Sequence, residues 1–177
     1  MTTPSELVFE GRALVFGDHV ANDGDLMALS FALARETDPD VLKAHIFAGI
    51  DPALAHQIQP NDIIITGKRF AHGNPHIQGF IGLKGAGVGL LTETIPSGSY
   101  RLAINAGVPI LPNCPNVRDI AQTGDQIQVD FNTGEVTNLT SGISQSYSPA
   151  PSHVRKIIAA GGWQPMFRAR LAEAGLE

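Results

Sequence analysis

The stretch from Asp62 to His76 constrains the fold more than any other part of this chain, and it reads D-I-I-I-T-G-K-R-F-A-H-G-N-P-H. Three consecutive isoleucines bounded by turn residues predict a short strand that is buried on both faces. The strand ends at Gly67, and a loop with Gly73 near its end leads into a helix expected from about Pro75 to Lys84. The first N–H groups of a helix lack intrahelical partners and carry a partial positive charge. A strand that delivers such a loop to a helix start therefore predicts an anion-binding site.

The basic residues of the chain gather around this loop. Residues 67–101 carry a local charge balance of +3, whereas the whole chain carries −5. The residues concerned are Lys68, Arg69, Lys84 and Arg101, against Glu93. Bases concentrated around one loop of an acidic protein favour a negatively charged ligand there. The sequence pI of about 5.6 argues against a nucleic-acid partner.

Length and composition indicate one globular domain. The chain has 177 residues, of which 43% are hydrophobic and 16% charged, and this is enough to bury a single core. We expect neither a membrane span nor a signal peptide, because no apolar run approaches ~20 residues and the N-terminus lacks a basic and an apolar region. Cys114 is the only cysteine, and we expect it to be a half-buried loop thiol. A single thiol favours the reducing cytoplasm, and it excludes both an intrachain disulfide and an iron–sulfur cluster held by this chain alone.

Turn residues and hydrophobic periodicity divide the chain into strands and helices followed by a β-meander. Strands are expected at Leu7–Phe16, Ile63–Thr66, Val88–Thr92, Val108–Leu111, Gln126–Phe131, Glu135–Leu139 and Ile143–Tyr147. Helices are expected at Leu26–Ala34, Pro39–Ala48, Pro52–Ile58, Pro75–Lys84, Pro96–Ala106, Asn116–Ala121, Val154–Ala160 and Gln164–Ala174. This order predicts an α/β domain with more than one sheet. We expect a single domain over residues 1–177, with a core at about 11–162 and a C-terminal helix at 163–177.

Eight segments occur in order between about Gly11 and Gly162, and each is only weakly specific by itself. They read F-G-D-H-V, D-P-D-V-L, A-G-I-D-P-A-L-A, D-I-I-I-T-G-K-R-F, Y-R-L-A-I-N-A-G-V-P-I-L-P, G-D-Q-I-Q-V-D, T-G-E-V-T-N-L-T-S-G and I-I-A-A-G-G. Their order and spacing together resemble the small subunit of 3-isopropylmalate dehydratase, the swivelling domain of the aconitase superfamily. The resemblance implies a β/β/α swivelling domain that closes over a separate large subunit in a heterodimer.

The same resemblance implies the chemistry. Water is eliminated from, or added across, a carbon–carbon bond of a hydroxy di- or tricarboxylate. The small subunit supplies carboxylate-binding groups and the base that removes the proton alpha to a carboxylate. A [4Fe–4S] cluster on the large subunit activates the departing hydroxyl as a Lewis acid. No cofactor or metal is expected on this chain itself.

The departures from the family pattern fall on the reactive loop. The family loop usually reads G-K-x-F-G-C-G-S-S-R-E-H, whereas this chain reads G-K-R-F-A-H-G-N-P-H-I-Q from position 67. Asn74 stands in place of the base serine, Pro75 in place of the second serine, and His76 in place of the carboxylate-binding arginine. The family's D-x-D near the N-terminus is A-N-D here, so only its second aspartate, Asp23, is retained.

We predict a catalytic group and a substrate-binding group of residues in and around this loop. The catalytic candidates are His76, Asn74 and Asp23, and the substrate-binding candidates are Gly73, Pro75, His72, Lys68 and Arg69. An unperturbed histidine titrates near about 6.5, which suits proton transfer at neutral pH. Proline at the first helical position leaves the backbone anion site intact. The alternatives are a turn role for Asp23 beside Gly24, and a solvated pair at a strand end for Lys68 and Arg69. The glycine and proline between His72 and His76 argue against a helical metal site.

Three interpretations of function remain open. The preferred one is a hydro-lyase small subunit whose substrate or base differs from that of the usual family member. The second is a true 3-isopropylmalate dehydratase small subunit of leucine biosynthesis, although a histidine cannot reproduce the two parallel hydrogen bonds of an arginine–carboxylate pair. The third is a non-catalytic binding or regulatory module. The apolar segment Leu26–Arg35 is either a lid over the substrate or an amphipathic helix packed on the core.

Overall fold

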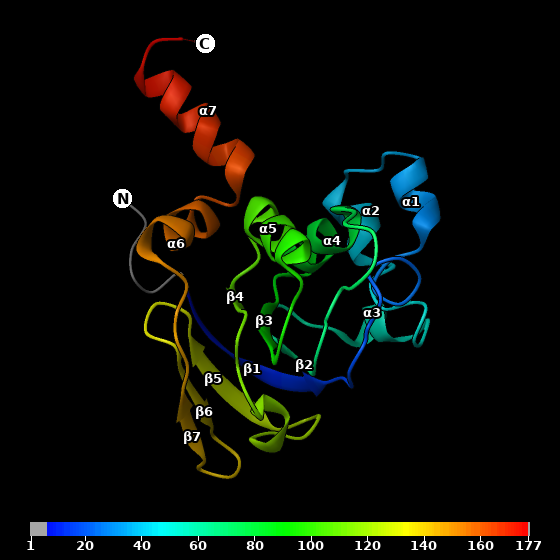
Figure 1. Ribbon diagram of the computed structural model, residues 1–177, viewed down its shortest axis with the longest axis vertical. Helices are drawn as coiled ribbons and strands as arrows, with labels where there is room; N and C mark the ends of the chain where they lie inside the picture. The colour runs from blue at the N-terminus through cyan, green and yellow to red at the C-terminus, as the bar shows by residue number, and fades with distance from the viewer. Residues whose placement is uncertain (1–6, 177) are drawn as a thin grey trace.

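The computed structural model describes residues 7–176, and its backbone is built around one seven-stranded sheet (Figure 1). The strands are β1 (Val8–Val15), β2 (Ile63–Thr66), β3 (Gly89–Thr92), β4 (Ile110–Leu111), β5 (Gln126–Asp130), β6 (Glu135–Asn138) and β7 (Ser144–Ser146). Their order in the sheet is β4-β3-β2-β1-β5-β6-β7. The half from β4 to β1 is parallel, and the half from β1 to β7 is antiparallel.

The prediction of more than one sheet is wrong, because β1 is long enough to serve both halves. Residues 13–15 of β1 pair in parallel with β2, whereas residues 8–12 pair antiparallel with β5. In the parallel half the three isoleucines of β2 are fully buried, as predicted. Strands covered on both faces need no polar alternation.

The helices follow the predicted order, and those before α6 are shorter than predicted. They are α1 (Leu29–Leu33), α2 (Pro39–Lys43), α3 (Leu54–Gln57), α4 (Gln78–Ala86), α5 (Ser97–Ala106), the 3-10 helix η2 (Val117–Asp119), α6 (Ser152–Ala159) and α7 (Trp163–Glu173). Asp38 caps α2 by accepting a hydrogen bond from the Asp40 amide, with Pro39 at the first helical position, as predicted. Gly107 ends α5 in the left-handed conformation, also as predicted.

Two of the shortened helices, α1 and α2, lie next to buried residues that leave the helical path. The helix expected to reach Ala48 ends at Lys43, and Phe47 then takes a left-handed φ of 60° with its ring stacked on Phe16 at 4.4 Å. The helix expected from residue 26 begins at 29, and the amides of Leu26 and Met27 donate to the carbonyls of residues 21 and 22 at 3.0 and 3.2 Å. Leu26 and Met27 are buried, whereas α1 buries none of its residues. A lid role for α1 stays a prediction.

Close packing of α2 on α4 depends on two glycines of α4. A β-carbon at Gly82 would lie 2.6 Å from the Ile46 side chain, and one at Gly85 would lie 2.6 Å from the Pro39 carbonyl oxygen. Neither position has room for a larger residue, so these glycines set the distance between the two helices. None of the helices within residues 7–176 is long and apolar enough to cross a membrane.

Candidate active site

The loop between β2 and α4 carries most of the predicted site residues. Helix α4 begins at Gln78 with Ile77 as its N-cap, three residues later than predicted, so Pro75 is not at the first helical position. The side-chain amide of Asn22 donates to the carbonyl oxygens of Asn74 and His76 at 2.8 and 3.0 Å. These two hydrogen bonds tie the backbone just before α4 to the segment that follows β1.

This loop is held in an uncommon backbone conformation. Arg69 and Ala71 take left-handed φ angles of 58° and 54°, which cost non-glycine residues roughly 1–2 kcal/mol each. The Arg69 amide donates to the Thr94 hydroxyl at 2.9 Å, and the Ser99 hydroxyl donates to the Ala71 carbonyl. Strained backbone that is fixed from several sides is typical of functional loops.

His76 and Asp23 meet at this loop although they lie 53 positions apart. The Nδ1 atom of His76 lies 2.8 and 2.9 Å from the two carboxylate oxygens of Asp23. The side chains are 39% and 23% exposed, so the pair is accessible at the surface. Within residues 7–176, the Nε2 atom of His76 has no hydrogen-bond partner. A carboxylate on Nδ1 favours the tautomer whose Nε2 lone pair is free to accept a proton.

The backbone next to this pair offers free donors. Gly73 and Asn74 are exposed, and Gly73 takes a φ of 98°. The N–H groups of these two residues donate no hydrogen bond to any residue between 7 and 176. Consecutive free amides beside a histidine are suited to holding a carboxylate.

The predicted anion site at the Gly73–His76 loop end lies before the first turn of α4, and it stays a prediction. The first turn of α4 is buried, and a β-carbon at Gly79 would lie 2.7 Å from the Leu26 side chain. Leu26 therefore covers the helix start, and the free donors lie earlier, at Gly73 and Asn74. Pro75 lies against α5, where a β-carbon built on Gly98 would be 3.6 Å from it.

The other predicted residues, His72, Lys68 and Arg69, make no hydrogen bond with His76 or Asp23. The Nε2 atom of His72 lies 3.0 Å from the His19 carbonyl oxygen, and the His72 carbonyl accepts from the Asn22 amide at 2.9 Å. Lys68 and Arg69 are exposed, and their side chains make no hydrogen bond or ion pair with residues 7–176. They can attract a substrate anion, but the structure gives them no fixed contact.

Asn22 and Arg118 also contribute contacts around the loop, and neither is among the predicted site residues. Asn22 is 1% exposed, and its Oδ1 atom is a buried acceptor without a partner among the described residues. Its place beside Asp23 in the A-N-D triplet was the one available signal. The Nη2 atom of Arg118 lies 3.0 Å from the Asp18 carboxylate, and its guanidinium lies over Gly67, where a β-carbon would approach it to 3.1 Å. No local motif marks Arg118.

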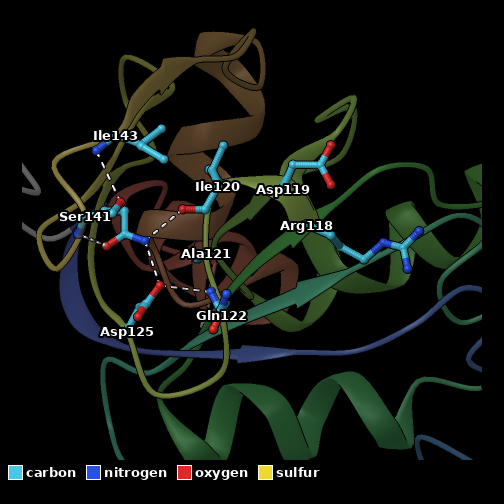
Figure 2. Close-up of a pocket in the computed structure, with 9 residues that line it drawn as sticks. Arg118, Asp119, Ile120, Ala121, Gln122, Asp125, Ser141 and Ile143 are labelled. Carbon is cyan, nitrogen blue, oxygen red and sulfur yellow. Dashed lines mark hydrogen bonds between the residues drawn. The ribbon is translucent and has the colours of Figure 1, made fainter.

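A cavity of about 490 Å³ lies between η2 and the turn that joins β6 to β7 (Figure 2). Asn138 donates to the Ile120 carbonyl and to the Asp125 carboxylate, both at 2.8 Å. The hydrogen bond from the Gln122 amide, together with that from Asn138, lowers the pKa of Asp125. Figure 2 shows Arg118 pointing away from Asp125. The polar groups of Asn138, Asp125 and Gln122 thus form hydrogen bonds with one another and stabilise this side of the cavity.

Metal ligands do not converge in the part of the chain that the structure describes. No group of three or more His, Cys, Asp or Glu side chains within residues 7–176 is placed to hold a metal ion. The Cys114 thiol is fully buried rather than half-buried, and burial raises its pKa to about 12. Since the thiolate is the metal ligand, this cysteine is unsuited to bind a cluster.

Comparisons with known proteins place these features in a family, although no family model matches the chain. The isopropylmalate/citramalate isomerase small subunit of Methanocaldococcus jannaschii is 33% identical over 168 residues, which are 94% of this chain and 98% of the relative. The 3-isopropylmalate dehydratase small subunit of Methanosarcina acetivorans is 36% identical over 154 residues, 86% of this chain and 92% of the relative.

A solved structure agrees with these relatives. The crystal structure of 3-isopropylmalate dehydratase from Methanocaldococcus jannaschii superposes with a TM-score of 0.83 at 27% identity, over 95% of this chain and 98% of that one. The predicted swivelling-domain fold and the predicted hydro-lyase subunit are confirmed. The relatives support the isopropylmalate alternative more than the interpretation with a changed substrate or base. The chain belongs to the family of 3-isopropylmalate dehydratase small subunits.

Proposed function

We propose that this chain works with a cluster-bearing large subunit, in the cytoplasm, to move water on a branched hydroxy-dicarboxylate of the isopropylmalate class. The names of the relatives support this substrate class. The observation that carries the proposal is the contact of His76 Nδ1 with Asp23, which leaves Nε2 accessible beside the free amides of Gly73 and Asn74.

In this proposal the residues of the loop divide the work. The Gly73 and Asn74 amides hold one carboxylate of the substrate, and the Asn74 side chain contributes a further donor. His76 Nε2 takes the proton from the carbon alpha to that carboxylate, and Asp23 orients the ring and stabilises the imidazolium that forms. In the hydration direction the same nitrogen returns the proton.

In this proposal the large subunit activates the hydroxyl group that leaves. The described residues of this chain do not fit a [4Fe–4S] cluster, because the single cysteine is buried with a pKa raised to about 12. We therefore place the cluster that the family resemblance implies on the partner, where a Lewis acid would be available to the leaving oxygen. The swivelling domain supplies the base and the carboxylate site from its side of the interface.

A second candidate keeps the reaction and changes the substrate to a malate or a methylated malate. The observation in its favour is the loop itself, which has His76 in place of an arginine fork and therefore binds a carboxylate with fewer parallel hydrogen bonds. A looser carboxylate site is compatible with a smaller diacid. The predicted roles of the other site residues are the same for both candidate substrates. These residues are Asp23, Gly73, Pro75, His72, Lys68 and Arg69.

The test is co-expression with the large subunit and an assay of the hydration of isopropylmaleate, methylmaleate and maleate. Preference for isopropylmaleate is the expected result, and preference for a smaller diacid selects the second candidate. His76→Ala is expected to lower kcat by about 10²- to 10⁴-fold. Asp23→Asn is expected to lower kcat by about tenfold or more and to alter the pH profile.

His153→Ala is the matched control, because His153 is exposed on α6 and is expected to leave turnover unchanged. Equal activity of the His76→Ala and His153→Ala complexes would remove His76 from the mechanism. Hydration of none of the diacids by a complex that contains both subunits and an intact cluster would refute the proposed function.

A further inference from the structure

A second cavity, of about 480 Å³, opens between α4, the end of α5 and the start of α7. We call it the Lys84 cleft, and its principal walls are Ile77, Ile81, Lys84, Asn105 and Trp163. Its volume falls within the range of about 300–1,000 Å³ that small-molecule sites occupy. Figure 1 shows α7 projecting from the domain next to α5 and α6, so the cleft lies where this helix leaves the rest of the protein.

Lys84 is the only charged residue among the described residues that line the cleft. It makes no ion pair and no hydrogen bond with residues 7–176. Lys84 is exposed, but the atoms around its ammonium group desolvate it enough to lower its pKa. An unpaired, partly desolvated cation is stabilised when an anion joins it. Asn105 lines the cleft as well, and its side chain carries a neutral amide donor.

Apolar side chains line the rest of the cleft. Ile77, Ile81 and Lys84 follow one another at helical spacing, so they share one face of α4. Trp163 is 47% exposed, and its ring stacks on Phe167 at a centroid distance of 5.7 Å and an interplanar angle of 19°. The Phe167 contact supports one side of the indole, which leaves an aromatic wall for a ligand.

The cleft is fixed by close backbone packing. A β-carbon at Gly107 would lie 2.5 Å from the Gly161 carbonyl carbon, and one at Gly162 would lie 2.4 Å from the Asn105 carbonyl oxygen. Both glycines also have positive φ angles, of 78° and 112°. The start of α7 is thus seated against the end of α5 with no side chain between them. The walls of the cleft are preformed, which lowers the entropic cost of binding.

We propose that the Lys84 cleft binds a small amphipathic carboxylate, with the carboxylate on Lys84 and Asn105 and a branched aliphatic or aromatic body against Trp163 and Ile81. This site is distinct from the His76–Asp23 pair. Ile77 lines the cleft, directly follows His76 and is the N-cap residue of α4, so a bound ligand would lie next to the end of the reactive loop.

Trp163 provides the readout, because it is the only tryptophan of the chain and it lines the cleft. The full chain is titrated with 4-methylpentanoate while tryptophan emission is recorded, and the heat of binding is measured in parallel. We expect saturable binding, and we expect neutral 4-methylpentanamide to bind about tenfold more weakly or worse. No saturable signal up to about 10 mM would overturn the proposal.

Variants separate this site from its surroundings and from the proposed catalytic function. Lys84→Met is expected to weaken 4-methylpentanoate about tenfold or more, and Lys84→Arg is expected to retain most of the affinity. Lys43→Met, an exposed lysine on α2, is the matched control and leaves binding unchanged. His76→Ala also leaves binding unchanged. Unaltered affinity in Lys84→Met, or loss of affinity in His76→Ala, would show that the carboxylate binds elsewhere.

Discussion

Asn22 is the residue that connects the segment after β1 with the loop bearing His76. Its side-chain amide donates hydrogen bonds to the carbonyls of Asn74 and His76, and the side chain is buried. The loop needs this support because Arg69 and Ala71 keep it in a left-handed conformation. At the residue scale, the position of the proposed base therefore depends on a buried, neutral side chain.

We expect Asn22→Ala to release the tripeptide from Asn74 to His76. The loss of two hydrogen bonds should cost about 1–3 kcal/mol of unfolding free energy. It should also lower kcat more than it changes KM, because His76 loses its orientation while the amides that hold the carboxylate remain. Urea unfolding and steady-state kinetics measure the two effects. Asn113→Ala, at an exposed loop position, is the control, and equal behaviour of the two variants would contradict the positioning role.

Asp125 makes the stability of the β5 region depend on pH. Hydrogen bonds from Gln122 and Asn138 lower its pKa in the folded protein. A carboxylate with a lowered folded pKa stabilises the protein above its unfolded pKa, and this contribution is lost as the pH falls through the folded value. Asp125→Asn should therefore lower the urea midpoint at neutral pH, and the difference from the unmodified protein should shrink below about pH 4. Asp119→Asn, in the same cavity, is the comparison, and a pH-independent difference for Asp125→Asn would refute the assignment.

At the scale of elements, α2 and α4 approach closely because Gly82 and Gly85 of α4 have no side chain. Alanine normally stabilises a helix relative to glycine by about 1 kcal/mol. Gly85→Ala should do the opposite and lower the melting temperature, because its β-carbon would lie 2.6 Å from the Pro39 carbonyl oxygen. Gly98→Ala in α5 meets only ordinary contacts at 3.6 Å and should be neutral or stabilising. Calorimetry measures the melting temperatures of both variants. A higher melting temperature for Gly85→Ala would contradict the prediction and show that α2 can shift to make room for the β-carbon.

For the whole molecule, Cys114 reports global unfolding. It is the only thiol, it is fully buried, and burial raises its pKa to about 12. Labelling with a disulfide reagent at pH 8 should be at least about 100-fold slower in the native protein than in denaturant, because the thiolate is the reactive species. Cys114→Ser carrying Ser97→Cys, an exposed position, is the control for reagent access. Rapid labelling of native Cys114 would mean that the region after β4 opens locally.

Much of this fold follows from local sequence. The Ile63–Thr66 strand is predictable because three isoleucines between turn residues have few other solutions, and Gly107 marks the end of α5 because glycine alone tolerates that φ angle cheaply. The reactive loop and Asp23 are also recognisable, since the loop keeps the family spacing after Gly67. Their roles in catalysis stay predictions.

Other features were beyond the sequence because they depend on residues far apart in it. Helix α4 starts at Gln78 and not at Pro75, and the side chain of the distant Asn22 holds the carbonyls of Asn74 and His76 just before it. The sheet is single because β1 happens to reach both β2 and β5. Arg118 reaches Asp18 across the chain without any local motif.

Local backbone preference and hydrophobic pattern thus determined which segments become strands and helices, and the family spacing identified the loop that carries His76. Only the tertiary structure decided that Asp23 supplies the partner of this histidine, that Leu26 covers the start of α4, and that Lys84 stands unpaired in a cleft. Patterns act over a few residues, whereas hydrogen-bond partners and packing neighbours are chosen when distant segments compete for the same donors and the same space.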